Sequence, residues 1–210
     1  MRNKAYLLLL LAPALAGCIE LAAVGVGAAA VSVEDRRTTG SQIEDEGIEL
    51  RASNRIAERF GDKVHVNVTS FNRAVLLTGE APDARTRDEI GKIASGVLNV
   101  RSVVNEIQIA GIASLASRSN DAFITSKIKA RFFDGAKFSP VHVKVVTEAA
   151  VVYLLGLVTP KEADDAVEYA RTTGGVRKVV KVFDYCKAAD PICVPPLPPG
   201  DGGAKSKPAS

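Results

Sequence analysis

Two stretches of the chain repeat one another at a nearly constant spacing. Val64-His-Val-Asn-Val68 recurs as Val141-His-Val-Lys-Val145, at an offset of 77. Val100-Arg-Ser-Val-Val104 recurs as Val176-Arg-Lys-Val-Val180, at an offset of 76. Self-similarity at a fixed spacing indicates copies of one structural unit, here of roughly 65 residues, which is near the lower size limit for a domain that folds alone. The sequence therefore predicts two small tandem domains.

Apolar residues spaced by four mark one face of an opening amphipathic helix in each copy. This stripe is Ile48, Ala52 and Ile56 in the first copy and Ile124, Ile128 and Phe132 in the second. We match Ala52, Ile56 and Phe60 to Ile124, Ile128 and Phe132, at an offset of 72. Because the strands are offset by 77, this match places an insertion within Phe133–Ser139 of the second copy.

The remaining elements follow in the same order in both copies. Two short strands come after the opening helix, and Thr159-Pro160 with Glu162 forms a capping box that starts a second helix. A β-branched strand closes each copy, at 100–109 and at 176–183. The predicted fold class is α+β: each module has the order α-β-β-α-β, with two helices on one face of a three-stranded mixed sheet. We expect the modules to span residues 47–110 and 119–185.

The N-terminus is typical of an exported protein. Arg2 and Lys4 precede a short apolar stretch, too short to span a bilayer, and residues 1–17 are predicted to be a signal peptide. Leu15-Ala-Gly-Cys18 resembles the lipobox of bacterial lipoproteins, which implies that Cys18 carries the acyl chains and that residues 18–46 form a tether. Ile19 after the cysteine, by resemblance to lipoprotein sorting, favours the periplasmic face of the outer membrane. The alternative is an unlipidated secreted protein.

The C-terminal segment contains the other two cysteines. If Cys18 is lipidated, Cys186 and Cys193 are the two remaining cysteines. Because the compartment is oxidising, we expect them to form a disulfide. Two exposed thiols, or pairing between molecules, are the alternatives. The Pro-rich segment after them indicates that residues 186–210 form an extended, disordered tail.

The combined layout resembles tandem BON domains. The resemblance rests on the two modules, the V-x-V strands, the turns at Leu77-Thr-Gly79 and Leu154-Leu-Gly156, and the closing Val-x-x-Val strands. Asp35-Arg-Arg-Thr-Thr-Gly40 also resembles a segment of dual BON-domain outer-membrane lipoproteins. That family implies no enzymatic activity. It implies a lipoprotein whose second BON domain binds anionic phospholipid, which supports envelope integrity and gathers at the division site. The cysteine-containing tail, and a Phe where the family's lipid-inserting helix can carry Trp, depart from the pattern.

A candidate lipid-binding surface lies on the opening helix of the second copy. Phe123, Lys127 and Arg131 form the stripe next to the core stripe, and an aromatic side chain leading two cations suits an anionic membrane surface. Lys129, Lys137 and Phe138 extend this predicted surface, whereas Arg51 aligns with Phe123 in the first copy. The alternative is that Phe123 packs between the modules and the lysines only solvate a helix face.

Other functions find little support in the residues. A net charge of +3 gives no field strong enough to indicate nucleic-acid binding, and no catalytic motif, metal site or cofactor site is expected. His65 and His142 alternate with core valines, so we interpret them as surface histidines. A scaffold that binds an envelope protein partner is the main alternative function. It would need an exposed apolar patch on a sheet face. A carrier of a soluble ligand would need a sizeable pocket.

Overall fold

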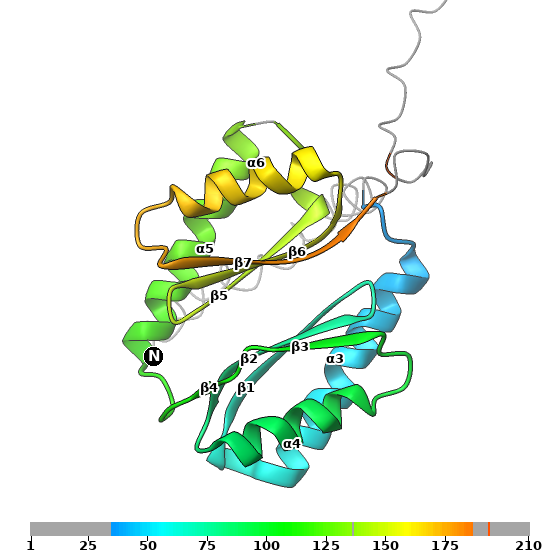
Figure 1. Cartoon of the computed structure of the whole chain (residues 1–210), viewed down its shortest axis with the longest axis vertical. Helices are drawn as coiled ribbons and strands as arrows, with labels where there is room; N and C mark the ends of the chain where they lie inside the picture. Colours follow the sequence, from blue (N-terminus) through cyan, green and yellow to red (C-terminus); the bar gives the residue numbers. More distant parts are fainter. Residues whose placement is uncertain (1–34, 136, 187–192, 194–210) are drawn as a thin grey trace, which may run out of the picture. The chain divides into compact units, whose positions relative to one another are not determined.

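The computed structural model describes residues 35–135, 137–186 and 193 (Figure 1). The first module contains α3 (Thr39–Phe60), β1 (His65–Phe71), β2 (Ala74–Ala81), α4 (Ala84–Ser95), β3 (Ser102–Asn105) and β4 (Gln108–Ile109). The second contains α5 (Leu115–Gly135), β5 (Val143–Glu148), β6 (Val151–Val158), α6 (Pro160–Arg171) and β7 (Lys178–Tyr185). The predicted order α-β-β-α-β is confirmed in the second module, and in the first module it is confirmed up to the closing strand, which is divided into β3 and β4.

Each module builds a mixed sheet around its second strand. Strand β2 pairs antiparallel with β1 and parallel with β3 and β4, and β6 pairs antiparallel with β5 and parallel with β7. The single strand expected at 100–109 is wrong, because Glu106 and Ile107 interrupt it between β3 and β4. At this interruption the amide oxygen of Asn105 accepts a hydrogen bond from the Ile107 amide at 3.3 Å, while the Glu106 amide still donates to the Leu77 carbonyl on β2.

The helices cover one face of each sheet, as predicted (Figure 1). The stripe Ile48, Ala52 and Ile56 of α3 is buried in one core, and Ile124, Ile128 and Phe132 of α5 are buried in another. The capping box is present at the start of α6, where Thr159 and Glu162 satisfy each other's backbone amides. The apolar periodicity and the cap therefore report the local structure correctly.

Helices α3 and α5 both begin earlier than predicted. Helix α3 starts at Thr39, inside the segment interpreted as tether, because the Thr38 hydroxyl caps it by accepting a hydrogen bond from the Ser41 amide at 3.1 Å. Helix α5 starts at Leu115, where the Ser114 hydroxyl accepts from the Ser117 amide at 3.2 Å. The tether boundary at residue 46 is therefore a correction: the described chain is already helical there.

The match between the two opening helices is wrong by one helical turn. A buried aspartate on each helix marks the true equivalence, since Asp45 accepts backbone hydrogen bonds from the β1–β2 turn and Asp121 accepts them from the β5–β6 turn. The offset between Asp45 and Asp121 is 76, so Ile48, not Ala52, corresponds to Ile124. Apolar residues that recur every four positions still match when one helix is shifted by four residues against the other. The sequence pattern therefore does not reveal an alignment error of one helical turn.

The faces of the two sheets that the helices leave uncovered contribute to a third core. Phe71 and Leu76 from the first sheet are buried in one cluster with Val151, Tyr153 and Leu155 from the second. Alternate residues of a strand point to opposite faces, so β2 and β6 contribute apolar residues to a core on each of their two faces. This explains why β2 is buried along its whole length.

Candidate functional site

Two phenylalanines project from α5 into solvent. Phe123 is 61% exposed, as the sequence predicts, and Phe133 is 67% exposed. Ten residues separate them, which is about 15 Å along a helix axis. The small side chains of Ala122, Ser126 and Ala130 are exposed on the same helix. Sequence reasoning missed Phe133. Phe132 belongs to the core stripe, and the residue that follows it along a helix faces a different direction, so the sequence already indicated that Phe133 is not a core residue.

Two of the predicted cations are held against the end of α6. Lys127 lies 4.7 Å from the centre of the Phe123 ring and donates a hydrogen bond to the Gly174 carbonyl. Arg131 donates to the Tyr169 carbonyl at 2.6 Å and to the Thr173 hydroxyl at 2.9 Å. Carbonyls at the C-terminal end of a helix lack intrahelical donors and carry partial negative charge. Arg131 therefore has a structural role in addition to any contact with a ligand.

The residues predicted to extend the surface divide into exposed and buried ones. Lys129 is exposed, and Lys137 is exposed 3.3 Å from Asp165. Hydrogen bonds from Lys161 and Lys137 lower the pKa of Asp165. Phe138 is only 8% exposed, so its assignment to the lipid-binding surface is wrong. The segment after α5 returns over the helix end and packs the Phe138 ring edge-on against Phe132, with ring centres 5.0 Å apart.

The first module has no comparable aromatic pair on its opening helix. With the corrected offset of 76, Gly47 corresponds to Phe123 and Ala57 to Phe133. Arg51, which the sequence aligned with Phe123, corresponds instead to Lys127, and it forms an ion pair with Glu44 at 2.6 Å. The large apolar side chains exposed on α3 are those of Ile43 and Leu50. The two phenylalanines thus distinguish α5 from α3.

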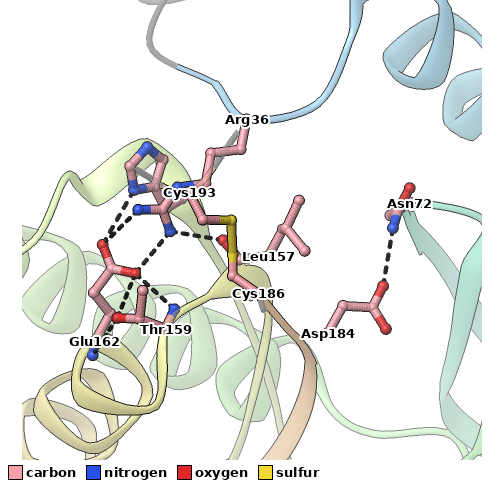
Figure 2. Close-up of a disulfide and its surroundings, with 9 residues drawn as sticks. Arg36, Asn72, Leu157, Thr159, Glu162, Asp184, Cys186 and Cys193 are labelled. Carbon is pink, nitrogen blue, oxygen red and sulfur yellow. Dashed lines mark hydrogen bonds and ion pairs between the residues drawn. A yellow bond between two sulfur atoms is a disulfide. The ribbon is translucent and has the colours of Figure 1, made fainter. Parts of the chain in front are cut away.

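The chain just before α3 is fastened to the second module (Figure 2). Arg36 donates to both carboxylate oxygens of Glu162, at 2.7 and 2.9 Å, and to the Leu157 carbonyl at 2.9 Å. Burial opposes ionisation of Glu162. However, the Arg36 guanidinium and the Thr159 amide and hydroxyl outweigh that effect and lower the pKa of Glu162 to about 2. Arg36 therefore holds the segment just before α3 against the module that carries Phe123.

A disulfide between Cys186 and Cys193 follows β7, close to this junction (Figure 2). Their Cα atoms are 6.0 Å apart, within the usual range for a disulfide. The Cys186 amide donates to the Val158 carbonyl at 2.9 Å, which extends the pairing of β7 with β6 by one bond. Cys18, the predicted lipidation site, lies outside the described residues.

Both histidines contact carboxylates, which corrects their interpretation as surface residues. The Nδ1 atom of His65 lies 3.1 Å from Glu80, and that of His142 lies 3.6 Å from Glu162. Their side chains are 23% and 12% exposed. Neither histidine belongs to a helix-covered core: His65 lies against Glu80 on the neighbouring strand, and His142 lies against Glu162 in the first turn of α6.

The chain matches a family of known domains twice. The model of the BON domain matches residues 44–111 and 120–187, two ranges with the same offset of 76 as the two buried aspartates. In the part of the chain that the structure describes, no helix combines the length and the hydropathy needed to cross a bilayer.

Curated relatives cover most of the chain. It is 38% identical to the outer membrane lipoprotein DolP of Haemophilus influenzae over 174 residues, which cover 81% of this chain and 90% of that protein. It is 33% identical to a 21 kDa hemolysin of Actinobacillus pleuropneumoniae, over 72% of this chain and 79% of the relative. The osmotically-inducible protein Y of Escherichia coli is 31% identical over 54% of this chain and 58% of its own length.

Proposed function

The chain belongs to the BON-domain family, as a dual BON-domain outer membrane lipoprotein of the DolP type, and from that premise we propose that its second BON domain binds anionic phospholipid through α5. The observation that carries the proposal is the exposure of Phe123 and Phe133 on one helix, beside the exposed Lys129. In this proposal the protein is anchored through Cys18, acts without catalysis, supports envelope integrity and gathers at the division site.

The magnitudes favour the aromatic residues as the main source of affinity. A phenylalanine fully transferred from water contributes roughly 1.5–3 kcal/mol, and the partial depth of a membrane interface delivers less. A cation near an anionic surface contributes about 1 kcal/mol. Lys127 and Arg131 already donate hydrogen bonds within the protein, so their contribution is the long-range attraction of a charge rather than a new direct contact.

Binding to vesicles tests this function. Residues 19–210, which lack both the signal peptide and the lipidated cysteine, are sedimented with vesicles of phosphatidylglycerol and phosphatidylcholine, or of phosphatidylcholine alone. We expect binding to the anionic vesicles only. Phe123→Glu and Phe133→Glu each weaken it, more than Lys127→Ala or Arg131→Ala, and the effect of the cation variants fades at high salt because exposed charges are screened.

A matched control separates a site on α5 from a general effect of added charge. Leu50→Glu makes the same kind of change on the exposed face of α3 in the first module. It leaves binding unchanged if α5 carries the site. Equal binding to neutral and anionic vesicles, or unchanged binding by a folded Phe123→Glu, Phe133→Glu double variant, would reject the proposed site.

A protein-binding scaffold is the second candidate function. The apolar patch that this function would need on a sheet face is not found among the described residues, since those faces form the third core. However, Ile43 and Leu50 are exposed seven residues apart on α3, and so lie on one side of that helix. Loss of a co-purifying envelope partner in the Leu50→Glu variant, with vesicle binding retained, would support this candidate.

A further inference from the structure

Three potential metal ligands meet at the face of the first sheet that the helices leave uncovered. His65 on β1 and Glu80 on β2 are cross-strand partners, and Glu148 ends β5 in the second module. Their imidazole nitrogen and carboxylate oxygens all lie within 4.8 Å of one another. Glu80 is 5% exposed and Glu148 is 4% exposed. Two buried carboxylates and a histidine are therefore gathered within the reach of a single ion.

The described residues leave this pair of carboxylates under-compensated. Glu80 contacts His65 at 3.1 Å, and Glu148 accepts one hydrogen bond from Asn67 at 2.9 Å. In residues 35–135 and 137–186 no lysine or arginine forms an ion pair with either carboxylate. Burying charged groups without full pairing costs on the order of several kcal/mol per ion in real proteins. A bound cation would offset this cost.

An orphaned hydroxyl and an open cleft lie beside the cluster. Thr78 is two residues before Glu80 on β2, so both side chains are on the same face, and Thr78 is the cross-strand partner of Asn67. Its hydroxyl is buried and has no hydrogen-bond partner within the described chain. His65, Asn67, Asp121, Thr147 and Glu148 also line a cleft of about 580 Å³, together with the exposed Arg118, which in the part of the chain described forms no ion pair with Glu80 or Glu148. The cleft provides a route for an ion and its water, and the hydroxyl provides a partner for such a water.

We propose that His65, Glu80 and Glu148 bind a zinc ion. Zinc sites use histidine nitrogen and carboxylate oxygen at roughly 2.0–2.2 Å, and three protein ligands leave a fourth position for water, which here faces the cleft. Calcium and magnesium instead prefer sets of six or more oxygen ligands. Tetrahedral ligands around zinc are about 3.3 Å apart, so side-chain rotations within the present cluster close the site.

His65 and Glu80 belong to the first BON domain and Glu148 to the second, so the ion joins the two domains. This inference does not depend on the lipid proposal, because none of the three ligands lies on α5 and the test requires no membrane.

The test is zinc binding by the full, untagged chain in detergent, stripped with a chelator and kept with its disulfide oxidised. We expect one zinc per chain by isothermal titration calorimetry and a raised Tm, with no comparable effect of calcium or magnesium. Glu148→Gln and His65→Gln each weaken zinc binding about tenfold or more, since even the partners of ligands contribute that much. Glutamine preserves the shape of glutamate, and circular dichroism checks the fold.

The second histidine of the repeat provides a matched control. His142 is the corresponding histidine of the second copy and lies just before β5, but it contacts Glu162, so His142→Gln keeps zinc binding. X-ray absorption of the zinc-loaded wild-type chain gives an independent readout, expected to show nitrogen and oxygen ligands without sulfur. Absence of saturable zinc binding, full binding by a folded Glu148→Gln variant, loss of binding in His142→Gln, or sulfur ligation would each overturn the proposal.

Discussion

Replacing Arg36 by glutamine tests whether the tether is fastened to the second BON domain by charge. The pKa of Glu162 falls from 4.5 to about 2 in the folded protein. At about 1.4 kcal/mol per unit, a shift of that size corresponds to roughly 3 kcal/mol of stability. The Thr159 cap supplies part of it and solvent screens the partly exposed pair, so we expect Arg36→Gln to cost about 2 kcal/mol at pH 7.

The direction in which stability changes with pH distinguishes an ion pair between Arg36 and Glu162 from an uncharged contact. A carboxyl group with a lowered folded-state pKa contributes its full stabilisation above its unfolded pKa, and loses it as the pH falls toward the folded value. The contribution of Glu162 is therefore complete above about pH 5 and is lost between about pH 4.5 and 2. The difference in stability between wild type and Arg36→Gln shrinks over the same interval.

Urea unfolding at pH 7, 4 and 2.5 measures this difference, because other carboxyl groups titrate alike in both proteins and cancel. Glu162→Gln removes the pH dependence of the difference, and the double variant with Arg36→Gln shows the coupling of the pair. The exposed Lys161, which pairs with Asp165, provides the control: Lys161→Gln leaves stability unchanged. A cost for Arg36→Gln that is the same at all three pH values would refute the electrostatic explanation.

Four further outcomes are expected. Phe138→Ala lowers the free energy of unfolding by about 3 kcal/mol in urea titrations, as for a buried core aromatic, and a cost below about 1 kcal/mol would contradict its burial. Asp121→Ala leaves the amides of Ala149 and Ala150 without their acceptor and costs about 3 kcal/mol, whereas Asp121→Asn costs less in the same titration. Thiol labelling of the unfolded, unreduced chain modifies neither Cys186 nor Cys193, and two reactive thiols would exclude the disulfide. The Cys18→Ala variant is absent from the outer-membrane fraction after cell fractionation, and its presence there would reject lipid anchoring.

Features encoded within a few neighbouring residues could be predicted from the sequence. The repeat identifies two modules because equivalent strands keep their residue types. The capping box at Thr159 and Glu162 specifies a helix start through bonds that span only three residues. The exposure of Phe123 follows from the core stripe beside it, since helix geometry turns the neighbouring stripe outward. These results need no knowledge of what packs against the element.

Tertiary structure decided every feature that depends on contacts between distant segments. Period-four patterns survive a one-turn slip, so only the bonds from Asp45 and Asp121 to their turns establish the offset of 76. Arg36 and Glu162 are far apart in the sequence, as are His65 and Glu148, and only the folded chain brings each pair together. Phe138 is buried because the segment after α5 folds back on its core. Hydrophobicity and strand alternation indicate which face of a helix or strand is buried. The residues that bury that face are determined by the packing of the whole chain.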